Sequence, residues 1–137
     1  MQIVDVNIVF PLIVRSALTG DVNELFELDP EWTSEPYALI ELSNILCTYE
    51  RANIVTKNEA VEAFRRAVDL LKPNLHSIAV EVALETARRH KITAYDSRYI
   101  ALAEKLDMPV ITEDVRLRKA VPEFTISLND ALALLRK

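Results

Sequence analysis

A single glycine, Gly20, stands among the 137 residues of the chain. Phosphate-binding loops and dinucleotide fingerprints need several glycines so that backbone N–H groups can approach a phosphate closely, and both are therefore excluded. Tight turns with positive φ also favour glycine, so the composition argues against an all-β fold with its many turns. The length is that of one ordinary domain, and we expect residues 1–137 to form a single domain.

The charge and the cysteine content limit the classes of binding partner. With 21 acidic and 16 basic residues the formal charge is −5, which disfavours a bulk electrostatic grip on nucleic acid. Cys47 is the only cysteine, so no internal disulfide or cysteine-based metal cage can form, and a cytoplasmic location is expected. The apolar segment Met1–Val14 lacks a basic flank and carries Asp5, Asn7 and Pro11, so we expect neither a signal peptide nor a membrane span.

Strand-like segments alternate with helix-like segments along the chain. The β-branched residues over Gln2–Phe10 are typical of a strand buried on both faces of a parallel sheet, and Asp5 and Asn7 come where such a strand should end. Shorter apolar segments predict strands at Trp32-Thr33, Pro109–Thr112 and Phe124–Ile126.

Helices are predicted from apolar stripes and from capping residues. Thr56 and Glu59 form a capping box, which predicts a helix from this point to about Lys72. The other expected helices are a short one between Pro11 and Gly20-Asp21 and longer ones over Pro36–Arg51, Val80–Lys91, Tyr95–Leu106 and from Ser127 to the end. This alternation predicts an α/β domain with a parallel sheet and helices on both faces.

Four carboxylates occupy positions that favour chemistry over packing. Asp5 and Asp114 follow two predicted strands, and ligands bind outside the carboxyl ends of the strands in an open parallel sheet. Glu41 and Asp96 border the apolar stripes of two predicted helices. Clustered carboxylates repel one another unless a cation neutralises them, and oxygen ligands without a cysteine or histidine cluster suit Mg²⁺ or Mn²⁺. Such an ion favours phosphodiester hydrolysis as the reaction class.

Each acid also has a structural alternative. Asp5 could end a strand through an Asx turn, Asp96 and Asp114 could be N-terminal residues of helices, and Glu41 could pair with a basic side chain. For Asp5 we prefer the functional interpretation, because a carboxylate among β-branched residues is costly to desolvate and has no evident local partner.

Four segments in order resemble those of a known family. They are Ile3–Val9 (IVDVNIV), Ile40–Leu46 (IELSNIL), Thr93–Ala103 (TAYDSRYIALA) and Val110–Asp114 (VITED). The set resembles the PIN-domain nucleases, and most closely the VapC toxins of bacterial and archaeal toxin–antitoxin pairs, over essentially the whole chain. The resemblance implies a PIN-like three-layer α/β domain with a central, mostly parallel sheet and helices on both faces.

The resemblance also implies an activity and a set of site residues. The activity would be Mg²⁺- or Mn²⁺-dependent endonucleolytic cleavage of RNA, with Asp5, Glu41, Asp96 and Asp114 as the catalytic acids. Asp5 and Asp96 would bind the ion most directly, Asp114 would complete its shell, and Glu41 would act through a water or a second ion. As a toxin of this kind, the chain would form a homodimer and be held inactive by a small cognate antitoxin protein.

One departure from the family pattern supports an alternative function. Val6 stands where the family often has Thr or Ser, so the chain could be a PIN-fold partner-binding module with weak or lost nuclease activity. Asn7 and Thr112 match family positions for which we expect a supporting hydrogen-bonding role. A phosphoacceptor or phosphatase-type domain fits less well, because the segment after Asp5 lacks the second Asp that such a phosphatase uses.

Basic and aromatic residues near the predicted site are candidates for substrate contact. For the basic residues Arg98, Arg116, Arg118 and Lys119, the default interpretation is solvated helix charge rather than phosphate binding. The tyrosines Tyr37, Tyr95 and Tyr99 could stack on unpaired bases, but their helical spacing favours packing in the core.

Overall fold

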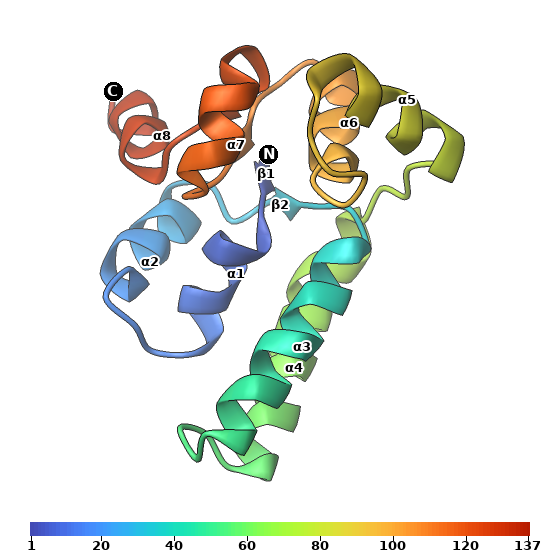
Figure 1. The fold of residues 1–137 in the computed structure, drawn as a ribbon. Coiled ribbons are helices and arrows are strands. Elements are labelled where there is room, and N and C mark those ends of the chain that lie inside the picture. The colour runs from blue at the N-terminus through green and yellow to red at the C-terminus, as the bar shows by residue number, and fades with distance from the viewer.

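A four-stranded parallel sheet lies at the centre of the computed structural model, which describes residues 1–137 (Figure 1). Its strands are β1 (Gln2–Val4), β2 (Trp32–Thr33), β3 (Val110–Ile111) and β4 (Thr125–Ile126), in the order β2-β1-β3-β4. The two central strands are β1 and β3. From β1 the chain continues to the edge strand β2, and from β3 it continues to the opposite edge strand β4. The crevice between β1 and β3, at the carboxyl ends of the strands, is where such sheets bind ligands.

Side chains on these short strands alternate between two hydrophobic cores. Val4 and Ile111 belong to the larger core, whereas their neighbours Ile3 and Val110 belong to the smaller one. All four are fully buried, as expected for strands that are covered by helices on both faces. The predicted three-layer α/β arrangement is confirmed.

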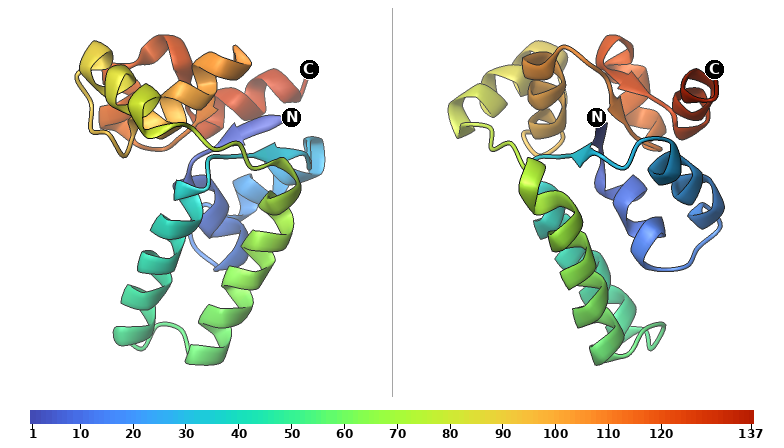
Figure 2. Two further views of the ribbon diagram at one scale, coloured as in Figure 1. Left: turned by 90° about the vertical axis from the view of Figure 1, so that its right-hand side faces the viewer. Right: turned by 180° about the vertical axis from the view of Figure 1, so that it is seen from behind.

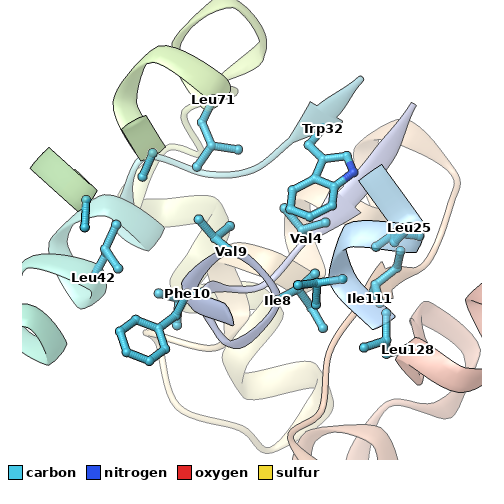
Figure 3. Packing of buried hydrophobic residues seen from close by; sticks show 14 of the residues in the cluster. Val4, Ile8, Val9, Phe10, Leu25, Trp32, Leu42, Leu71, Ile111 and Leu128 are labelled. Atoms are coloured by element: carbon cyan, nitrogen blue, oxygen red, sulfur yellow. The ribbon is translucent and has the colours of Figure 1, made fainter. Parts of the chain in front are cut away.

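The larger core is enclosed by five helices and is centred on the sheet face that carries Val4 (Figure 3). Trp32 is completely buried there, and its Nε1 donates a hydrogen bond to the backbone oxygen of Asp29 at 3.0 Å. The helices are α1 (Val6–Ile13), α2 (Thr19–Leu28), α3 (Tyr37–Arg51), α4 (Lys57–Leu71) and α8 (Leu128–Leu135).

Three further helices cover the opposite face of the sheet. They are α5 (Val80–His90), α6 (Ser97–Leu106) and α7 (Val115–Ala120). Helix α6 contributes an unbroken buried run from Tyr99 to Ala103, and α7 contributes only Leu117. Short 3₁₀ turns at Lys72–Asn74 and Pro122–Phe124 complete the secondary structure.

Helices α3 and α4 lie side by side and project away from the sheet (Figures 1 and 2). The predicted capping box begins α4: the amide of Glu59 donates to Thr56 Oγ1 at 3.1 Å, and the amide of Thr56 donates to Glu59 Oε1 at 2.8 Å. The end of α3 nearest the sheet is its N-terminal end, so Tyr37 and Glu41 lie close to the sheet.

The beginning of the chain differs from the prediction. The predicted strand over Gln2–Phe10 is wrong beyond Val4, because α1 begins at Val6 and contains Pro11. Gly20 does not break a helix but lies inside α2, where a Cβ atom would meet nothing within 4 Å. Helices α2 and α7 were not predicted as such. No helix combines the length and apolarity needed to cross a membrane.

Candidate active site

Asp5 lies at the carboxyl end of β1, and its side chain is the most buried of the four predicted acids. The residue is only 5% exposed, and its amide donates to the backbone oxygen of Ile111 in β3 at 3.0 Å. Its Oδ2 accepts hydrogen bonds from Thr112 Oγ1 at 2.7 Å and from Asn7 Nδ2 at 3.3 Å. Both side-chain bonds fall on the same oxygen, Oδ2. The hydrogen bonds expected of Asn7 and Thr112 are therefore present.

Burial raises the pKa of Asp5 from 3.8 to about 6. The hydrogen bond from Thr112 opposes this rise, and the negative charges of Asp96 and Asp114 add to it. The fold thus places a carboxylate whose charged form is disfavoured at the carboxyl end of β1, within electrostatic reach of Asp96 and Asp114.

Glu41 reaches the same region from the second turn of α3. The hydroxyl of Tyr99 in α6 donates to Glu41 Oε1 at 2.5 Å, which joins the two helices. Burial raises the pKa of Glu41 to about 7, the Tyr99 hydrogen bond opposes the rise, and the charges of Asp5 and the other two acids increase it. The partner of Glu41 is therefore a tyrosine, not the basic side chain considered from the sequence.

Asp96 and Asp114 both stand at the N-terminus of a helix, but only Asp114 caps its helix with its side chain. The side chain of Asp96 makes no capping bond to α6, and its pKa is raised by burial and by the charge of Asp114. In contrast, Asp114 Oδ1 accepts a hydrogen bond from the amide of Leu117 at 3.1 Å and caps α7. The structural alternative is therefore observed for Asp114, which still has its second carboxylate oxygen.

A cavity of about 430 Å³ opens beside Asp96 and Asp114. Two exposed cations, Lys91 and Arg116, line it, and the positive charge of Arg116 lowers the pKa of Asp96. Lys91 was missed in the sequence. It ends α5 with a φ of 57°, and this left-handed turn leads directly into the segment that carries Asp96.

Two of the four basic candidates bond to other parts of the protein, and two are exposed to solvent. Arg98 pairs with Glu35 at 3.2 Å, and Arg118 donates to the backbone oxygen of Thr112 at 2.7 Å. Lys119 is exposed but does not line the cavity, so Arg116 alone among the four combines exposure with a place beside the acids.

Of the tyrosine candidates, one is buried in a core and one is exposed on the surface. Tyr99 is 1% exposed and belongs to the smaller core, as its spacing predicts. Tyr95 is 63% exposed and stacks on the half-buried Tyr37, so core packing does not account for it.

The four acids do not form a ready-made coordination sphere. No group of three or more His, Cys, Asp or Glu side chains is arranged to hold a metal ion as it stands. Their mutual influence on pKa places them in one electrostatic cluster, while the assignment of Asp5, Asp96 and Asp114 as metal ligands stays a prediction.

Comparison with known proteins places this fold and site in a family. The family model of the PIN domain matches residues 3–121. Ribonuclease VapC3 of Pyrobaculum aerophilum is 31% identical over 88 residues, which cover 62% of this chain and 67% of that protein. The crystal structure of PAE2754 from Pyrobaculum aerophilum has the same fold, with a TM-score of 0.78 at 18% identity over 98% of this chain and 96% of that chain. The resemblance inferred from the four ordered segments is confirmed, and the chain belongs to the PIN domain family.

Proposed function

We propose that the chain is a metal-dependent endoribonuclease that hydrolyses RNA phosphodiester bonds and acts as the toxin of a type II toxin–antitoxin pair. The observation that carries this proposal is Asp5, a buried carboxylate at the ligand-binding edge of the sheet whose two side-chain hydrogen bonds both fall on Oδ2. Membership of the PIN domain family and the similarity to a ribonuclease of the VapC type support a nuclease. The proposal includes an RNA substrate, a small cognate antitoxin protein, a homodimer and a cytoplasmic location.

The donor atoms fit Mg²⁺ or Mn²⁺. These ions prefer oxygen ligands, keep several waters and need only one or two direct carboxylate contacts, so the absence of a ready-made cage does not conflict with binding. Asp5 and Asp96 would hold the ion and Asp114 would help to complete its shell. When bound, the ion stabilises charge on the phosphate and lowers the pKa of a bound water.

The protein side chains then have separate roles. Thr112 and Asn7 fix the Asp5 carboxylate through Oδ2, so Oδ1 would be the oxygen that contacts the ion. Glu41 has a pKa of about 7 and can take up a proton near neutral pH, as a general base requires. The hydroxyl of Tyr99 orients the Glu41 carboxylate.

The alternative is a PIN-fold partner-binding module with weak or lost nuclease activity. It is favoured by Val6 and by the lack of a ready-made metal cage. Against it, Val6 packs into the larger core, and the hydroxyl of Thr112 already bonds to Asp5. We therefore favour the nuclease.

The test is the Asp5→Asn variant, which we expect to lose RNA cleavage in purified form and growth inhibition on expression, with an unchanged circular dichroism spectrum. Asp69→Asn removes an exposed carboxylate on α4 and serves as the matched control, which should cleave and inhibit growth like the wild type. Equal cleavage and toxicity of wild type and Asp5→Asn would overturn the proposal. No cleavage by any of the three proteins, together with no metal binding, would favour the partner-binding module.

A further inference from the structure

Two tyrosine rings are stacked on the surface next to the acidic cluster. Tyr95 directly precedes Asp96, and Tyr37 lies one helical turn before Glu41 in α3. The ring centroids are 5.5 Å apart and the ring planes differ by 13°. The pair thus joins two segments that each carry one of the predicted catalytic acids.

Tyr37 contacts an ion pair between the buried Glu35 and the half-buried Arg98. Glu35 is 1% exposed and pairs with Arg98 at 3.2 Å, and the guanidinium carbon of Arg98 lies 6.0 Å from the centroid of the Tyr37 ring. Glu35 Oε1 also accepts a hydrogen bond from the amide of Tyr37 at 3.2 Å. The ion pair therefore contacts Tyr37 through both its backbone amide and its ring, and Tyr37 in turn stacks against Tyr95.

The exposure of Tyr95 leaves its ring accessible to a ligand. Its ring is 63% exposed, whereas Tyr99, one turn further along the same segment, is 1% exposed. The charges of Glu41 and Asp96 raise the pKa of Tyr37, after the larger effect of burial, so the stack lies within their field. That field repels an anionic group but not a neutral aromatic ring, and nucleic acid bases are neutral aromatic rings.

Asp96 links the stacked rings to a cationic cavity. It lines the cavity together with Lys91 and Arg116, whereas its chain neighbour Tyr95 does not line it and stacks on Tyr37. A single RNA strand alternates neutral bases with anionic phosphates and can therefore contact both the rings and the cations. In a duplex, both faces of each base are already stacked, so the tyrosine ring would have no free face to contact.

We propose that Tyr95, supported by Tyr37, is the platform on which one unpaired base of single-stranded RNA stacks beside the cleaved phosphate. The proposal rests on the proposed nuclease function and assigns to Tyr95 the contact with a base of the substrate. Tyr95 contacts the substrate, and Arg98 and Glu35 act as positioning residues.

Binding of labelled oligoribonucleotides tests the platform. In the Asp5→Asn background, where cleavage is expected to be lost, fluorescence anisotropy gives the Kd for a single-stranded 12-mer and for a hairpin of equal length. We expect Tyr95→Leu to weaken single-strand binding by about tenfold or more, which is the usual range for loss of one stacked base. Tyr95→Phe keeps the ring and should bind like the parent. Val80→Ala serves as a further control. It changes an exposed apolar side chain on α5, away from Tyr95 in the sequence, and should leave the Kd unchanged.

An abasic scan makes the test specific for stacking. Removing one base at a time from the 12-mer should reveal one position at which the parent loses affinity and Tyr95→Leu loses none, since the ring and the base form one interaction. Losses that add independently at every position would overturn the platform. Equal loss of hairpin and single-strand binding, or a changed oligomeric state of Tyr95→Leu in sedimentation, would also overturn it, the latter in favour of a protein interface.

Failure of the platform and failure of the nuclease are distinguishable in the wild-type background. If the platform alone is wrong, Tyr95→Leu cleaves and binds single-stranded RNA like the wild type. If the nuclease is wrong, the wild type does not cleave RNA, while a Tyr95-dependent preference for single strands still supports the platform.

Discussion

The carboxyl group of Asp5 is held away from water by the apolar residues around it, so its pKa rises from 3.8 to about 6. In the unfolded chain the group ionises near its ordinary value. Between these two values the folded state binds a proton that the unfolded state does not bind, so stability increases as the pH falls from above 6 towards 4. At pH 8 the Asp5 carboxyl group is ionised in both states, so the free energy of unfolding is reduced by the full cost of burying its charge.

Asp5→Asn should therefore stabilise the metal-free protein at pH 8. The difference between pKa values of 3.8 and about 6 corresponds to at most about 3 kcal/mol. Urea unfolding in EDTA at pH 8 and pH 5 measures the effect, and the gain of the variant over the wild type should shrink at pH 5. A gain of equal size at both pH values would show that the charge of Asp5 is not its cause.

The positions of three of the four candidate acids in the fold were predictable from the sequence. Asp5 and Asp114 follow strands and Asp96 precedes a helix, as expected, while their roles stay predictions. The bond from Tyr99 to Glu41 was not predictable, because it joins residues 58 positions apart on helices from different layers. Lys91 was missed because only its left-handed backbone directs the chain into the cavity wall, and a lysine in that conformation has no sequence signature.

Among the elements, α1 is the one that hydrophobic periodicity assigned to the wrong type of secondary structure. Val6, Ile8, Val9, Phe10 and Pro11 are all buried, so this helix is apolar around most of its circumference. A short continuous apolar run of this kind cannot be told from a buried strand by its pattern. Helices α3, α4, α5 and α8 were predicted because each is exposed on one side or begins with a capping residue. Helix α7 has six residues and a single buried side chain, which is too little for a stripe.

Helix α7 also gives a prediction, because it presents Arg116 to the cavity and Lys119 elsewhere. Arg116→Gln should raise the KM for RNA several-fold at low salt with little change in kcat, since a phosphate contact contributes to binding of ground state and transition state alike. Lys119→Gln removes the same charge from the same helix and should leave KM near the wild-type value. An equal rise in both variants would indicate only long-range attraction by net charge.

For the whole molecule, metal binding and folding should be linked. A ligand that binds only the folded state stabilises it by about 2.7 kcal/mol at a concentration of 100 times its Kd. Mn²⁺ should therefore raise the Tm of the wild type by roughly 5–10 °C. The double variant Asp5→Asn/Asp96→Asn should show no shift in the same scanning fluorimetry, and Asp69→Asn should shift like the wild type. A shift in the double variant would place the ion elsewhere.

The two hydrophobic cores are separated by strands of only two or three residues. Glu41 belongs to a helix that packs mainly into one core, Asp96 and Tyr99 belong to the layer of the other, and Asp5 stands between them. Under the proposed function, activity would therefore depend on the alignment of the two layers, which the Tyr99–Glu41 hydrogen bond connects. A small shift of one layer against the other would separate the acids while every helix stays intact, so RNA cleavage should be lost at a lower temperature than the helical circular dichroism signal.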